Sequence, residues 1–142
     1  MASFFQVPDD IKVKLQKLTE ESDWYSFMGE LNLGEAVECD LEDSWPLWQN
    51  TTMSLNTELK YLFMGDVKPR LDEGGGPQVG FVSANTVTQI AKIFNDNDRS
   101  YFVEILESGG LSAETDIYFY DVLKSFLNDC KHKQKAILLV LV

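Results

Sequence analysis

The chain ends in seven consecutive apolar residues, Ala136 to Val142, most of them branched. This run is too short for a helix of ordinary length, and it follows the basic stretch 131–135. Short runs of branched apolar residues are typical of strands that are buried on both faces. We therefore predict that 136–142 forms a central strand, and that the fold is organised around a sheet.

Two further segments have the pattern of strands. Residues 3–7 precede Pro8, which ends the strand, and residues 78–82 alternate in the way expected of a half-buried strand. Between the strands, apolar residues recur at helical spacing. These helical segments are 11–18, 24–28, 45–48, 55–64, 87–94, 101–107 and 122–127. The sequence predicts an α+β fold in which a small sheet packs against several helices.

The length and composition indicate a single domain covering residues 1–142. The chain is 44% hydrophobic and 25% charged, which is typical of a globular protein with one packed core. The glycine-rich run Gly74–Gly76 is too short for a domain linker and is interpreted as a loop. The sequence contains no internal repeat of ~20–50 residues, so a solenoid is not expected.

The charge balance excludes two classes of partner. There are 12 basic and 23 acidic residues, giving a formal net charge of -11. Such a chain repels phosphate backbones and anionic membranes, so we expect neither nucleic acid nor membrane as a partner. No apolar run approaches the ~20 residues of a membrane span, and the N-terminus does not resemble a secretory signal. We expect a cytoplasmic protein.

The acidic residues are concentrated in one segment. Between Glu20 and Asp43 there are nine acidic residues and no basic one. Acidic residues beside aromatic anchors suit a basic partner protein, because charge steers association and buried aromatics supply affinity. An ordinary solvated face is the alternative for any one of these carboxylates. The predicted partner-binding residues are Glu35, Glu38, Asp40, Glu42 and Asp43, with Trp45 or Trp48 as the anchor.

Motifs of catalysis and metal binding are not found. Cys39 and Cys130 lack the spacing of a zinc or redox site, and they are expected to be reduced. The single histidine, His132, has no nucleophile or orienting acid beside it in sequence and is predicted to lie in an exposed turn. The segment 96–107 resembles a calcium loop, but Tyr101 stands where glycine is required, so a capped helix is predicted there. We expect a protein that is not an enzyme and that uses no cofactor or metal.

The order of several short motifs resembles the YfbM-like family, small bacterial α+β proteins of uncharacterised function. The resemblance covers nearly the whole chain and implies a fold more than a function. The motifs are an N-terminal strand, Asp43-Ser44-Trp45 opening a helix, the segment 77–83 leading into Val87, Asp116-Ile117-Tyr118, and an apolar strand after Lys135-Ala136.

Two functions remain open from the sequence. The first is an immunity protein that neutralises a cognate bacterial toxin by covering its basic active surface with carboxylates. The second is a small-molecule or regulatory binding domain with a pocket between sheet and helices. Such a pocket would be lined by Trp45, Trp48, Phe81 and Tyr118.

Overall fold

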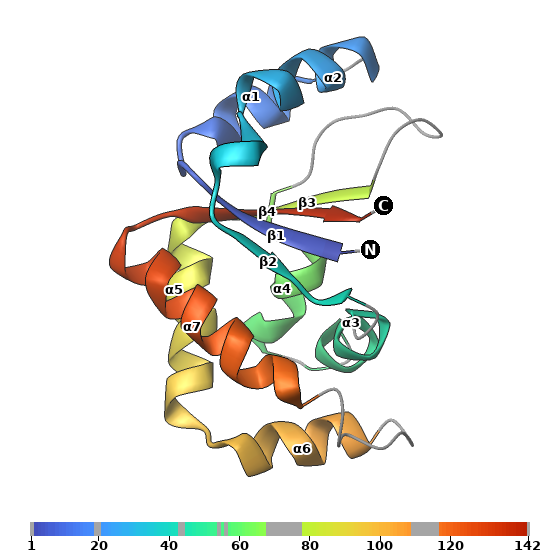
Figure 1. Cartoon of the computed structure of the whole chain (residues 1–142), viewed down its shortest axis with the longest axis vertical. Helices are drawn as coiled ribbons and strands as arrows, with labels where there is room; N and C mark the ends of the chain where they lie inside the picture. Colours follow the sequence, from blue (N-terminus) through green and yellow to red (C-terminus); the bar gives the residue numbers. More distant parts are fainter. Residues whose placement is uncertain are drawn as a thin grey trace.

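A four-stranded antiparallel sheet forms the centre of the protein, with strand order β2-β1-β4-β3 (Figure 1). The computed structural model describes residues 2–18, 21–42, 45–53, 55, 57–67, 78–108 and 117–141. The fold class is α+β, as predicted. The strands are β1 (Ala2–Val7), β2 (Glu38–Asp40), β3 (Gln78–Val82) and β4 (Ala136–Leu141).

The C-terminal strand β4 is central, as its apolar sequence predicts. It pairs with β1 along its whole length and with β3 on the other side. Its residues alternate between two hydrophobic clusters, because successive side chains of a strand point to opposite faces. Ile137 and Leu139 belong to one cluster, and Ala136 and Leu138 belong to the other.

Helices α1 (Ile11–Lys17) and α2 (Glu21–Glu30) cover one face of the sheet (Figure 1). Leu15 of α1 and Phe27 of α2 are buried against Phe81 and Leu138 of the strands. The sequence predicts α2 only as a short turn that ends before Gly29. That prediction is wrong, because α2 continues through Gly29 to Glu30.

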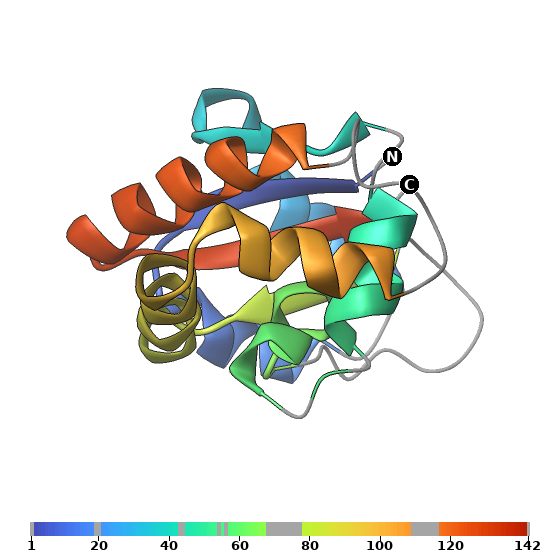
Figure 2. The ribbon, with the colours of Figure 1, turned by 90° about the horizontal axis from the view of Figure 1, so that it is seen from below.

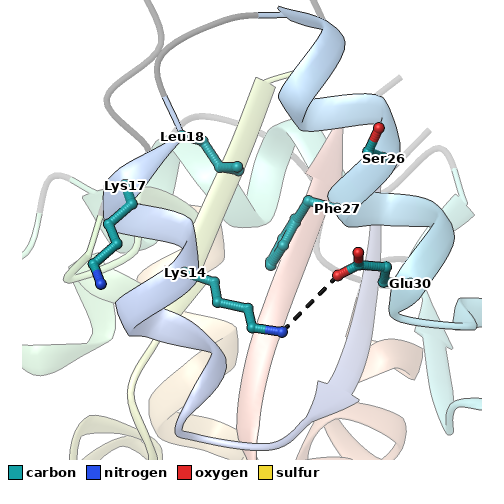
Figure 3. A pocket seen from close by; sticks show the side chains of 6 residues that line it. All are labelled: Lys14, Lys17, Leu18, Ser26, Phe27 and Glu30. Atoms are coloured by element: carbon teal, nitrogen blue, oxygen red, sulfur yellow. Dashed lines mark ion pairs between the residues drawn. The ribbon is translucent and has the colours of Figure 1, made fainter.

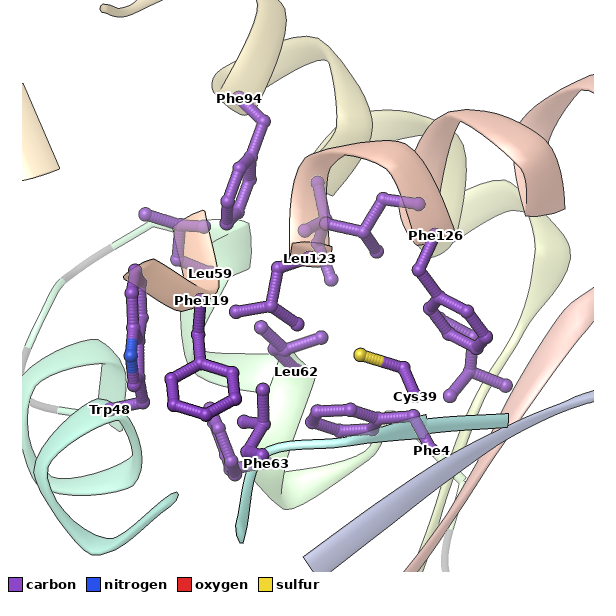
Figure 4. Close-up of a cluster of buried hydrophobic side chains, with 14 of the residues drawn as sticks. Phe4, Cys39, Trp48, Leu59, Leu62, Phe63, Phe94, Phe119, Leu123 and Phe126 are labelled. Atoms are coloured by element: carbon purple, nitrogen blue, oxygen red, sulfur yellow. The ribbon is translucent and has the colours of Figure 1, made fainter. Parts of the chain in front are cut away.

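The other face carries the larger hydrophobic core. It is covered by α3 (Trp45–Met53), α4 (Tyr61–Met64), α5 (Ala84–Asp96), α6 (Arg99–Glu107) and α7 (Tyr118–His132). Figure 2 shows this layer in front of the strands. Figure 4 shows that side chains from β1, β2 and the helices meet there, among them Phe4, Cys39 and Leu123.

Aromatic rings fill the part of this core farthest from the sheet. The ring of Phe102 lies 4.4 Å from Phe94, 5.0 Å from Tyr120 and 6.3 Å from Trp48, centroid to centroid. Contacts at these distances stabilise a core beyond the burial of apolar area. The aromatic cluster joins α3, α5, α6 and α7 into one layer.

The continuous helix predicted over 55–64 is not formed. A 3₁₀ helix, η3 (Glu58–Lys60), follows Thr57, whose side chain accepts a hydrogen bond from the Leu59 N–H. The single α-helical turn α4 follows and ends at Gly65, which has a φ of 74°. Apolar spacing places Leu59, Leu62 and Phe63 on one buried side, but the same spacing is satisfied by these two shorter elements.

Side chains from other elements hold the N-terminus of α5. Ser83 is the N-cap residue, as predicted, but its hydroxyl donates to the Asp66 carboxylate. The hydroxyl of Thr86 and the main-chain N–H of Ser83 also donate to Asp66. These bonds attach the strand-to-helix step 82–84 to the turn after α4.

Candidate functional site

The acidic segment forms an edge strand that sequence patterns did not predict. β2 pairs with β1 on one side only, with Phe4 opposite Cys39 and Phe5 opposite Glu38. In the described part of the chain no strand lies on its other side. The opposite edge of the sheet differs, because Phe81 of β3 is bridged to Val67. β2 is therefore the open edge of the described sheet.

The hydrogen-bond pattern directs part of the β2 main chain away from the sheet. The Gln6 N–H donates to the Val37 carbonyl at 2.9 Å, which marks this facing pair as hydrogen-bonded. Antiparallel pairs alternate between hydrogen-bonded and non-hydrogen-bonded, so Cys39 also bonds to β1, whereas Glu38 and Asp40 do not. The N–H and C=O groups of Glu38 and Asp40 consequently point outward.

Two of the predicted partner-binding carboxylates, Glu38 and Asp40, lie on β2, and Glu35 and Glu42 lie in the segments just before and just after it. Glu35, Glu38, Asp40 and Glu42 are all exposed, whereas Cys39 between them is buried. Asp40 accepts a hydrogen bond from the Glu42 N–H at 2.8 Å. None of the four carboxylates forms an ion pair within the described residues. The edge is an uncompensated negative surface, which we call the acidic edge (Glu35, Glu38, Asp40 and Glu42).

An apolar side chain that sequence analysis missed lies within the acidic edge. Val37 is 46% exposed, although valine is usually buried. Strand alternation would place Val37 on the same face as buried Cys39, so the sequence pattern carries no signal for its exposure. Val37, directly before Glu38 in the sequence, gives the acidic edge an apolar contact point.

The predicted tryptophan anchor is not at this surface. Trp48 is only 1% exposed and belongs to the core of the α3–α7 layer (Figure 4), so a partner cannot contact its ring in this conformation. The helical spacing that suggested an anchor reflects the packing of Trp48 in the core. Trp45 begins α3, but the position of its side chain, and all of Asp43, lie outside the described residues.

The alternative pocket residues do not converge on one space. Trp48 and Phe81 belong to the two clusters on opposite faces of the sheet. Tyr118 is 66% exposed at the start of α7. The structure therefore contradicts a pocket lined by these three residues with Trp45. Sequence patterns do not give the strand order, so they could not show which of these residues lie on the same face of the sheet.

Carboxylates with perturbed pKa values have structural partners. A hydrogen bond from the Ala84 N–H lowers the pKa of Asp9, and bonds from Ser100 and Tyr101 lower that of Asp98, the N-cap of α6. Bonds from Lys133 and Gln6 lower the pKa of Asp129. Because Asp98 caps α6, the capped helix predicted in place of a calcium loop is confirmed. These carboxylates act in helix capping and packing.

The two thiols are buried and unpaired with each other, as predicted. His132 is exposed, as predicted, but it is the last residue of α7 and does not lie in a turn. Burial raises the pKa of Cys39 and of Cys130 to about 12. Among the described residues no cluster of histidine, cysteine and acidic side chains is suited to a metal ion. No helix in that part of the chain has the length and apolar character needed to cross a bilayer.

The arrangement defines a class of small α+β proteins in which helices cover both faces of an antiparallel sheet. A solved structure with this fold is that of YfbM from Escherichia coli, described as a protein of unknown function. The two chains superpose over 100% of each with a TM-score of 0.59 and 13% sequence identity. This likeness concerns the fold, and it confirms the YfbM-like fold predicted from the sequence. No protein-family model and no curated protein matches the sequence.

Proposed function

We propose that this protein is a non-enzymatic binding protein of the cytoplasm whose acidic edge recognises a basic partner. The partner that fits best is a cognate bacterial toxin, which the protein neutralises as an immunity protein. The observation that carries the proposal is the group of four exposed carboxylates on and beside an open edge strand, two on β2 and two in the segments that flank it. No cation of the described chain neutralises them.

The acidic edge offers two kinds of contact to a partner. Its carboxylates complement lysine and arginine side chains, and the outward main-chain groups of Glu38 and Asp40 can pair with an added strand. Exposed Val37, directly before Glu38, adds apolar area to this surface. A toxin cleft that binds an anionic substrate is basic, so a surface of this kind would occupy it in the manner of the substrate's phosphates.

Charge explains how such a complex would form quickly. A net charge of -11 together with a local concentration of carboxylates steers a basic protein toward this edge. Steering depends on ionic strength, because surface charges are screened over ~8 Å at physiological salt. Binding should therefore have a strong salt dependence in its association rate.

The test uses two charge-reversed variants with the same change in net charge. Glu38→Lys/Asp40→Lys alters the acidic edge, and Glu104→Lys/Glu107→Lys alters two exposed positions on α6. Each variant and the wild type would be used as bait in a lysate of the source cells. We expect a basic protein in stoichiometric amount with the wild type and the α6 variant, and its loss with the edge variant.

A growth assay then separates an immunity protein from other binding proteins. The captured protein should arrest growth when expressed alone, and coexpression of the wild type or the α6 variant should restore growth. The edge variant should not restore it. Equal capture by the edge variant would disprove the role of the acidic edge, and a harmless partner would disprove the immunity function.

A further inference from the structure

A pocket of about 390 Å³ lies between α1 and α2, on the face of the sheet opposite the large core (Figure 3). Its volume falls within the ~300–1,000 Å³ range of small-molecule sites, near the lower end. It is separate from the acidic edge and does not involve the proposed partner. Its lining residues are Lys14, Lys17, Leu18, Ser26, Phe27 and Glu30.

The two helices supply opposite charges to the pocket. Lys14 and Lys17 come from α1, whereas Glu30 comes from α2. Figure 3 shows the charged ends of Lys14 and Glu30 facing each other across the space between the helices. A ligand that carried only a negative charge would meet Glu30, and one that carried only a positive charge would meet Lys14.

The Lys14–Glu30 pair is loose. Its Nζ–Oε2 distance is 3.9 Å, beyond hydrogen-bond range, and the two side chains are 72% and 69% exposed. Exposed pairs of this kind stabilise a fold by ~1 kcal/mol or less. Both side chains are long and solvated, so they can separate at small cost and each bind an opposite charge placed between them.

The remaining lining groups favour an apolar body beside those charges. Leu18 and the nearly buried ring of Phe27 form an apolar wall, and Ser26 adds a hydroxyl. In Figure 3 the ammonium of Lys17 points away from Phe27, so this residue contributes its aliphatic stem to the wall. The pocket thus combines a cation, an anion and an apolar surface.

We infer that the α1–α2 pocket binds a free α-amino acid with an apolar side chain. The ligand carboxylate would pair with Lys14, the ligand ammonium would pair with Glu30, and the side chain would contact Leu18 and Phe27. The zwitterion replaces one weak exposed pair by two charge-assisted hydrogen bonds, which are stronger than neutral ones. This inference is independent of the proposed function.

The test is a titration followed by amide chemical shifts in ¹H–¹⁵N spectra. Phenylalanine at millimolar concentration should shift amides of α1 and α2. N-acetylphenylalanine lacks the ammonium, phenylalaninamide lacks the carboxylate and glycine lacks the side chain, so each should bind more weakly. Lys14→Gln and Glu30→Gln should each weaken phenylalanine binding about fivefold, as expected for the loss of an exposed charge contact.

Lys92→Gln is the matched control. Lys92 is 72% exposed, as Lys14 is, and it pairs with Asp96 on α5, across the sheet from the pocket. This variant should bind phenylalanine like the wild type. If phenylalanine causes no shifts in α1 and α2, or if N-acetylphenylalanine binds as tightly as phenylalanine, the inference is wrong. Because the substituted side chains are exposed, all variants should keep the wild-type spectrum elsewhere.

Discussion

The carboxylate of Asp9, in the turn before α1, accepts a hydrogen bond from the main-chain N–H of Ala84 at 2.8 Å. Ala84 is the first residue of α5, so a residue from the opposite layer caps this helix. The first N–H groups of a helix have no partner within it, and an acidic side chain there also interacts favourably with the helix dipole. Asp9 thus connects the helices on the two faces of the sheet.

Asp9→Ala should lower the free energy of unfolding by about 1 kcal/mol at neutral pH, the usual cost of losing a helix cap. Asp10→Ala is the control, because Asp10 is the exposed N-cap of α1 and its side chain makes no capping bond. Urea denaturation of both variants would measure the difference. Equal losses in the two variants would contradict the capping role of Asp9.

The contribution of Asp9 should depend on pH with a defined sign. Its pKa in the folded protein is lowered from 3.8, chiefly by the bond from Ala84, so folding favours the ionised form. The stabilisation is therefore complete at pH values well above 3.8 and is lost as the pH falls through the lower, folded pKa. The wild type and Asp9→Ala should differ most at neutral pH and converge in acid, when urea denaturation is repeated across this range.

Gly65 is a position where a side chain should be strongly unfavourable. It has a φ of 74°, and a Cβ atom there would lie 2.8 Å from the main-chain nitrogen of Phe81. Gly65→Ala should cost about 1–3 kcal/mol, because strained backbone is combined with a contact against a strand that cannot move. Gly29→Ala should instead stabilise by about 0.5–1 kcal/mol, since Gly29 lies within α2 and has open space around it.

Thermal unfolding of these two glycine variants would compare the effects directly. The melting temperature should decrease for Gly65→Ala and increase for Gly29→Ala. A neutral Gly65→Ala would mean that the turn after α4 does not lie as close to β3 as the structure places it.

The strands rich in apolar residues could be predicted because burial alone determines their pattern. The consecutive apolar residues 136–139 are buried on both faces of the sheet, and 78–82 precede a well-marked helix. β2 could not be predicted in the same way, because only Cys39 of its three residues is buried. Its pairing depends on β1, which lies far away in sequence.

The acidic edge could be predicted as a set of residues but not as a surface. Charge clustering identified Glu38 and Asp40, whereas the strand that aligns them depends on long-range pairing. The anchor prediction failed for a related reason. Trp48 has the helical spacing of an anchor and of a core residue alike, and only the packing against Phe102 distinguishes the two.

The two thiols should react slowly in the native protein. Cys39 and Cys130 are buried, and each has a pKa raised to about 12, so roughly one thiol in ten thousand is ionised at a pH of about 8. Ellman's reagent should label both rapidly in denaturant and only slowly in buffer. Fast labelling of either thiol in buffer would show that β2 or α7 opens readily.

The charges of β2 should also keep the protein from pairing with itself. Exposed edge strands template association, and charged side chains on a short edge strand oppose it. In Glu38→Thr/Asp40→Thr the edge keeps its outward main-chain groups and loses both charges, so we expect dimers or larger species in sedimentation velocity at tens of micromolar. Glu104→Thr/Glu107→Thr has the same change in net charge but on α6, and this variant should sediment like the wild type. If the edge variant sediments like the wild type, its main-chain groups are not accessible to another strand, and a partner must contact the acidic edge through side chains alone.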